Sequence, residues 1–99
     1  MDYQIIFEKD FDAYANEVED LKGFFVVGVK LGPSVIQMLF YDPSRLRQDV
    51  ERTLEIGDIF FERNIIVVPA ITRTNIEQAI ERLNIISALQ KINDELTKQ

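Results

Sequence analysis

Few side chains in this chain of 99 residues could do catalytic chemistry, because it contains no histidine and no cysteine. Ser-His-Asp and Cys-His catalysis, and the usual zinc, haem and copper sites, need one or both of these residues. What remains is chemistry by carboxylates, tyrosine, lysine and hydroxyl groups, or oxygen ligation of Mg²⁺ or Ca²⁺. The composition therefore favours a protein that is not an enzyme and that carries no cofactor, with an enzyme of this restricted chemistry as an alternative.

Two segments come close to the spacing of known binding loops. Residues 23–30 almost follow the spacing of a phosphate-binding loop, but one extra residue precedes the lysine, and the interior is strand-forming Phe-Phe-Val-Val. Asp10 and Asp12 begin like a calcium loop, but the next ligand positions lack oxygen ligands and the required glycine. Strand formation explains the first segment better, and helix capping explains the second.

Two pairs of carboxylates have the spacing that could hold a divalent cation on a helix. Glu51 and Glu55 form one pair, and Glu77 and Glu81 form the other. Arginines interleave with both pairs at neighbouring positions of the chain. Oppositely charged residues three or four positions apart attract one another on a helix surface, so the pattern favours a solvated, salt-bridged face and no metal site.

The negative charge is concentrated near the N-terminus. The net charge is −6, and residues 1–22 contribute −5 of it, with two lysines against seven acids (2 − 7). This balance disfavours nucleic acid and anionic membranes as ligands. A helix expected over residues 11–21 would carry most of these acids, so one alternative function is an acidic inhibitor or immunity-type protein that binds a basic partner.

The chain has the length of a single domain, residues 1–99, and shows no internal repeat or linker. It contains no apolar run of the length that a membrane span needs, and its start lacks the pattern of a secretory signal. The absence of cysteine fits a reducing compartment. We therefore expect a cytoplasmic domain.

Apolar periodicity and turn residues divide the chain into seven elements. Strands are expected over residues 4–7, 24–31, 35–41 and 65–68. Helices are expected over residues 11–21, from Pro43 to Gly57, and for some 20 residues from Asn75 onward. Residues 59–61 are left open between strand and loop.

Particular residues set the helix boundaries and the place of the last strand. Asp42 is a suitable N-cap before Pro43, and residues 74–77 fit a capping box for the last helix. Pro69 at the end of the last strand predicts a position at a sheet edge, because proline cannot donate to a strand ladder.

The element order β-α-β-β-α-β-α predicts an α+β fold. It matches the ferredoxin-like βαββαβ plan, with four antiparallel strands, plus an additional long C-terminal helix. If residues 4–7 are not a strand, the alternative is an α+β sandwich with three strands.

Apolar residues exceed what a sheet covered on one side needs. In the strand over 24–31, alternate residues on both faces are apolar, whereas an exposed face should be polar. A second face of this kind must be covered by the last helix, a second copy of the chain or another partner.

The last predicted helix carries an apolar stripe that changes side. Ile76, Ala79, Ile80 and Leu83 share one side, and beyond Asn84 the stripe continues on the opposite side with Ile85, Leu89, Ile92 and Leu96. These last four residues are either ordinary core or an interface with a partner.

Together these features predict a small acidic domain that interacts with proteins or associates with itself, as a homodimer or larger homo-oligomer, through Ile85, Leu89, Ile92 and Leu96. The alternatives are the acidic inhibitor and a regulatory domain that senses a small molecule at a dimer interface, the latter by analogy with other domains of this fold.

Overall fold

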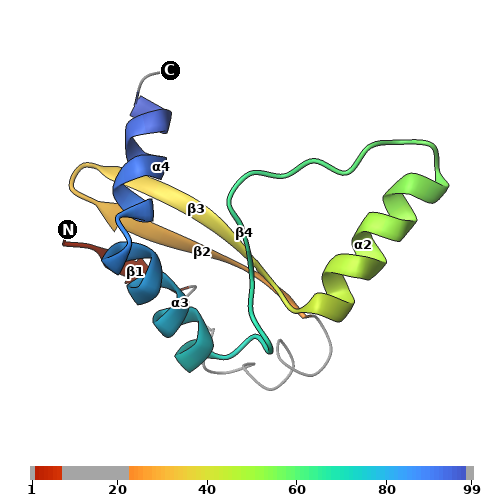
Figure 1. Ribbon diagram of the computed structural model, residues 1–99, viewed down its shortest axis with the longest axis horizontal. Helices are drawn as coiled ribbons and strands as arrows, with labels where there is room; N and C mark the ends of the chain where they lie inside the picture. The colour runs from red at the N-terminus through yellow and green to blue at the C-terminus, as the bar shows by residue number, and fades with distance from the viewer. Residues whose placement is uncertain (1, 8–22, 98–99) are drawn as a thin grey trace.

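The computed structural model describes residues 2–7 and 23–97 of the chain (Figure 1). The fold is α+β, with a four-stranded sheet and three helices in this described part. The helix predicted over residues 11–21, with its acidic face, lies outside the described residues. The elements are β1 (Gln4–Ile6), β2 (Phe24–Leu31), β3 (Ser34–Tyr41), α2 (Pro43–Glu55), β4 (Ile65–Val67), α3 (Arg73–Ile85) and α4 (Ala88–Thr97).

The hairpin of β2 and β3 is the centre of the sheet. The two strands pair antiparallel over their full length, from Phe24 opposite Tyr41 to Leu31 opposite Ser34. Gly32 lies in the turn with φ of 59°, a left-handed conformation that glycine adopts without steric cost. The predicted hairpin is confirmed.

The sheet has the strand order β1-β2-β3-β4, with β1 and β4 at its two edges. The expectation of a ferredoxin-like antiparallel sheet is corrected, because β4 pairs parallel with β3, and the sheet is therefore mixed. In the ferredoxin-like plan the first strand separates the third from the fourth. Here β1 pairs antiparallel with the outer side of β2 instead, with Ile5 opposite Val29.

The position of β1 explains the parallel pair. Because β1 leaves the outer side of β3 free, the crossover through α2 returns the chain directly beside β3. A strand, a helix and a neighbouring parallel strand form the common βαβ unit. Hydrophobic alternation shows which residues form strands, but it carries no information about which strands are neighbours. The edge position predicted for the last strand from Pro69 is confirmed.

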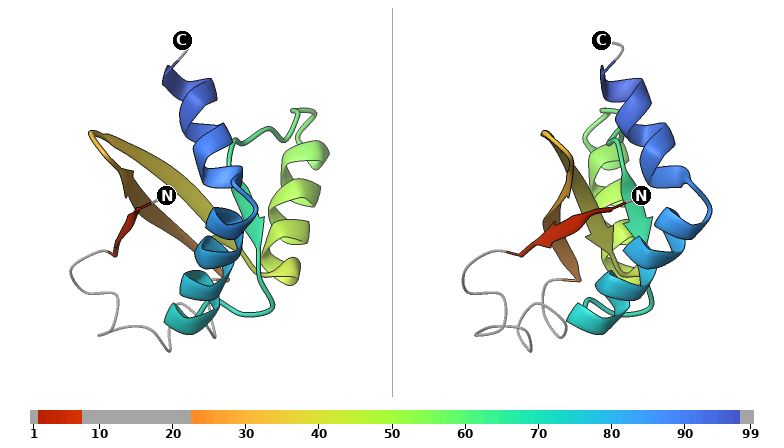
Figure 2. Two further views of the ribbon diagram at one scale, coloured as in Figure 1. Left: turned by 60° about the vertical axis from the view of Figure 1, so that its left-hand side comes forward. Right: turned by 90° about the vertical axis from the view of Figure 1, so that its left-hand side faces the viewer.

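The hydrophobic core lies between one face of the sheet and the two C-terminal helices (Figure 2). From the hairpin, alternate residues contribute to it, including Val27, Val29, Ile36, Met38 and Phe40, all fully buried. The helices contribute Ile76, Ile80 and Leu89, which are also fully buried. At about 25 cal/mol per Å² of apolar surface, this one-sided core is the main source of stability that the described residues offer.

Helix α2 begins as predicted but packs differently. The Asp42 side chain accepts a hydrogen bond from the Arg45 backbone N–H at 2.7 Å, and Pro43 occupies the first helical position. From their spacing in the sequence, Leu46, Val50, Thr53 and Leu54 are expected to form a buried stripe on this helix, and this expectation is wrong in part. No residue of α2 is fully buried, and Leu54, expected inside, is more than half exposed. In Figure 1, α2 leaves the end of β3 and runs away from the sheet.

The single long C-terminal helix of the prediction is replaced by two helices. Thr72, not Thr74, is the N-cap of α3, and its hydroxyl accepts a hydrogen bond from the Asn75 N–H at 3.0 Å. The helix stops at Ile86 and Ser87, and Ser87 has a left-handed φ of 62°. The break falls close to Asn84, where the apolar stripe changes side. Breaking the helix lets the residues beyond it turn back to the core.

The segment between α2 and β4 contains no regular structure, so residues 59–61 form a loop. Within the described ranges, no helix has the length and hydrophobicity that crossing a membrane requires.

The contact of Gly23 with the start of α2 yields a test of this fold. Gly23 has a φ of 61°, and a Cβ there would lie 2.6 Å from Asp42 Oδ2, the side chain that caps α2. Gly57 has a φ of 81°, and a Cβ there would meet nothing within 4 Å. We expect Gly57→Ala to cost about 1 kcal/mol of unfolding free energy through backbone strain alone. Gly23→Ala should cost at least about 2 kcal/mol, because the cap must also move. Equal losses of unfolding free energy in the two variants, measured by urea denaturation, would show that residue 23 does not lie against the Asp42 side chain.

Candidate functional site

The second face of the sheet, opposite the core, is apolar and partly exposed. We call it the open face and define it by Ile6, Phe24, Val26, Val35, Leu39, Ile65 and Val67, which the register places on one side. Ile6, Val35 and Val67 are about half exposed. Phe24, Val26, Leu39 and Ile65 are partly buried. The two-sided apolar pattern predicted for β2 is therefore present, and α3 and α4 cover only the other side.

One end of the open face is closed by a cluster that joins it to α2. The rings of Phe24 and Tyr41 lie 4.7 Å apart between centroids, and the Arg45 guanidinium lies 5.8 Å from the Phe24 centroid. Arg45 Nε also donates to Asp49 Oδ1 at 3.0 Å. Burial raises the pKa of the Tyr41 hydroxyl, and the nearby Asp49 carboxylate raises it further. This cluster fixes only the first two turns of α2 to the sheet.

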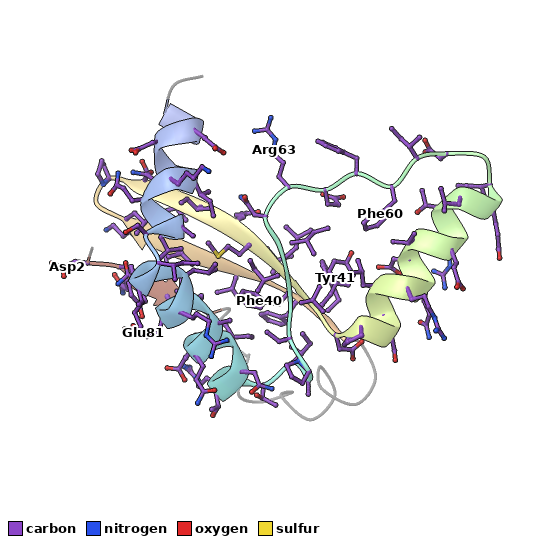
Figure 3. All side chains as sticks on the ribbon, in the orientation of Figure 1. Asp2, Phe40, Tyr41, Phe60, Arg63 and Glu81 are labelled. Carbon is purple, nitrogen blue, oxygen red and sulfur yellow. The ribbon has the colours of Figure 1, made fainter. Side chains whose placement is uncertain are left out.

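Beyond that cluster, α2 and the following loop carry a series of exposed apolar side chains. We call these residues the loop surface: Leu54, Ile56, Ile59 and Phe61. Ile56 and Ile59 are each 77% exposed and Phe61 is 72% exposed. Figure 3 shows Phe60 pointing to the inside of the arch formed by α2, residues 56–64 and β4, whereas Arg63 points outward. Four large apolar side chains in water along one short segment are unusual for a chain that has no partner.

A polar groove of about 770 Å³ lies on the other side of the molecule, between β1 and α3. Contacts bridge it at two points. The Tyr3 hydroxyl donates to Glu81 Oε2, and the Arg73 guanidinium lies 4.1 Å from the centroid of the Phe7 ring. The hydrogen bond to Glu81, together with partial burial, raises the pKa of Tyr3 to about 12. A tyrosine that is held neutral in this way is a poor base at neutral pH.

Of the metal and phosphate sites considered from the sequence, Asp10 and Asp12 lie outside the described residues, and the two carboxylate pairs and residues 23–30 lie within them. Among the described residues, no three His, Cys, Asp or Glu side chains are grouped so that they could hold a metal ion. Glu51 Oε1 lies 3.8 Å from Arg47 Nε, and Glu81 Oε2 accepts a hydrogen bond from the Tyr3 hydroxyl. Gly28 lies within β2, and a Cβ there would meet Val35 at 3.4 Å, so this segment is packed strand and not a phosphate loop.

The four predicted interface residues do not form one surface. Leu89 is fully buried in the core, and Ile92 packs partly buried against it. Ile85 is 71% exposed at the end of α3. Leu96 belongs to α4, but its side chain lies outside the described residues. At least the central part of the stripe is therefore core, while contact of Ile85 with a partner stays a prediction.

The loop surface was missed at the level of sequence. Its signal was the apolar triplet at residues 59–61, which has neither helical nor strand periodicity and therefore could not be assigned to an element. An apolar run without periodicity, placed after a helix-terminating glycine, was the available indication that side chains there lack a partner inside the fold.

Neither a protein-family description nor a curated protein nor a solved structure matches this chain. Functional conclusions therefore rest on the chemistry of its own surfaces.

The groove between β1 and α3 gives a pH test. Because the folded-state pKa of Tyr3 is about 12 and the ordinary value is 10.0, the folded chain holds this proton in a range where the unfolded chain loses it. The contribution of this protonated Tyr3 to the unfolding free energy is complete below about pH 10 and should disappear as the pH rises toward 12. We expect the unfolding free energy, measured in urea, to fall over this range, and Tyr3→Phe to make the fall shallower. An unchanged slope in Tyr3→Phe would show that the bond to Glu81 does not form.

Proposed function

We propose that this chain is a non-enzymatic interaction domain that associates with itself through the side of the molecule formed by the loop surface and the open face. The single observation that carries the proposal is that α2, an amphipathic helix of 13 residues, has no fully buried residue. Its apolar side continues directly into the exposed residues Ile56, Ile59 and Phe61.

The energetics of α2 support association. An isolated helix of this length is marginal in water, and most helices in proteins are stabilised by packing of an apolar face. In the described structure, the N-terminal part of α2 packs through Arg45 and its aromatic neighbours, and Val50 and Thr53 further along are partly buried, whereas Leu54 is exposed. A partner that covers Leu54 and the loop would supply the missing packing for the C-terminal part.

The shape and charge of this side favour a protein partner. The open face is a sheet surface with mostly apolar side chains, and the exposed polar residues Gln37 and Lys30 lie toward its hairpin end. An apolar surface with polar residues at its margin is typical of protein interfaces. The net charge of −6 disfavours nucleic acid. We place the domain in the cytoplasm because it has no cysteine.

The groove between β1 and α3 favours a second candidate, a domain that senses a small molecule. Its volume of about 770 Å³ and its charged walls suit a polar ligand. The third candidate, an acidic inhibitor of a basic protein, depends on the helix predicted over residues 11–21 and stays a prediction from the sequence.

The proposal is tested by measuring the molecular mass by light scattering or sedimentation at protein concentrations from about 1 to about 500 μM. We expect association in the micromolar range, and we expect Ile59→Lys with Phe61→Lys to weaken it at least about tenfold, because two buried charges replace apolar contacts. The matched control is Ile85→Lys with Ile86→Lys, a pair of similar exposure at the end of α3.

A chain that stays monomeric at the highest concentration contradicts the proposal of self-association. Association that only the control pair weakens places the interface at the end of α3, as the sequence predicted, and contradicts the location proposed here. Circular dichroism of all variants checks that each retains the fold.

A further inference from the structure

A second hollow, of about 390 Å³, lies between β4 and α3 at the edge of the sheet. Ile66 and Val68 from the strand side, and Ala79 and Leu83 from the helix, form an apolar wall. Val67 and Ile86, which also line it, are about half exposed or more. The hollow has the size and the largely apolar lining of sites that take small organic molecules.

The charged lining of this hollow consists of one arginine. Arg82 lines it, and no aspartate or glutamate does. Within the part of the chain that the structure describes, Arg82 makes no ion pair. The Asn75 amide, also in the lining, already donates to the Ala70 carbonyl at 2.9 Å. The cation beside the apolar wall is therefore the group available to fix the head of a ligand.

We propose that this hollow binds a small amphiphilic carboxylate, with its aliphatic body against the apolar wall and its head group at Arg82. A guanidinium binds a carboxylate through two parallel charge-assisted hydrogen bonds, a geometry that gives both strength and orientation. An amine ligand would find no counter-charge in this lining. A phosphate ester or nucleotide would need further donors, and no second cation lines the hollow.

An extended peptide is a poorer fit to the same place. Peptides that join a sheet edge need a row of free backbone groups along the strand. β4 has only three residues, and Pro69, which has no N–H to donate, follows it closely. The edge is thus too short for strand addition, whereas the side chains beside it form an apolar hollow.

Carboxylate binding does not require self-association, because the two surfaces consist of different residues apart from Val67, which lines the hollow and also belongs to the open face. The two claims can fail separately. A chain that is monomeric at every concentration could still bind the carboxylate, and a chain that associates need not bind it.

The test uses the full chain and three probes of equal length, octanoate, octanol and octylamine, with the two charged probes below their micelle concentrations and octanol below its solubility limit. Binding is followed by NMR shifts of the methyl groups of Val68, Ala79 and Leu83, which line the hollow and lie outside the association surface, with Ile59 as the distant reference. We expect octanoate to shift the first three, and octanol and octylamine to bind at least about tenfold more weakly.

Variants separate the head group from the wall. Arg82→Gln should reduce the affinity for octanoate about tenfold and leave that for octanol unchanged. Arg52→Gln is the matched control, since Arg52 is also an exposed arginine in the last turn of its helix, and it should change neither affinity. Ala79→Leu, which fills the hollow, should weaken octanoate and octanol alike.

Several results would overturn the inference. These are the absence of shifts with octanoate, equal affinity for octanoate and octanol, an affinity unchanged in Arg82→Gln, and shifts centred on Ile59. Spectra of each variant without ligand show whether it is folded, and Arg82→Lys provides a folded substitute that keeps the charge but loses the paired hydrogen bonds, for which we expect an intermediate affinity.

Discussion

The packing of α3 and α4 on one face of the β2–β3 hairpin is the interaction on which the described structure depends. The fully buried side chains come from this face and from the helices and connections that cover it. The break at Ile86 and Ser87 serves the same contact, because it turns α4 so that Leu89 returns to the core. Without the break, a straight continuation of α3 would carry Leu89 away from the sheet, since the apolar stripe changes side near Asn84.

Committing both C-terminal helices to one face leaves the other face with α2 as its only helical neighbour in the described structure. That helix is joined to the sheet at its N-terminal end, by the Asp42 cap and the cluster of Phe24, Tyr41 and Arg45. Its C-terminal end and the loop after it then expose large apolar side chains. The surface that we propose for association is thus a consequence of how the core is built. Among the described elements, no further helix is available to cover the second face.

Much of the local structure could be predicted from the sequence. Asp42-Pro43 predicts the start of α2, the glycine turn predicts the hairpin, and Pro69 predicts the edge position of β4. These predictions succeed because capping, turn geometry and the missing N–H of proline act within a few residues. They need no knowledge of distant parts of the chain.

The failures concern relations between distant residues. The neighbour of β1 and the parallel pairing of β4 depend on which strand edges are free, and periodicity does not encode that. The helix break at Ser87 has no glycine or proline to announce it, since a serine adopts the left-handed conformation there. The stripe that includes Leu89 stays open between core and interface at the level of sequence, because one apolar stripe looks the same whether it packs on the chain's own sheet or on a partner, and the structure places Leu89 in the core. The hollow at Arg82 depends on β4 and α3 lying together, and no local pattern indicates it.

Amide hydrogen exchange at two protein concentrations would decide whether α2 lacks a partner within the single chain. At low micromolar concentration, we expect amides in the C-terminal half of α2 to exchange much faster than those of α3 around Ile76 and Ile80, which are fully buried. At several hundred micromolar, protection of α2 should increase while that of α3 stays constant. Protection of α2 equal to that of α3 at the lowest concentration, without dependence on concentration, would show that α2 is already fully packed within one chain and needs no partner.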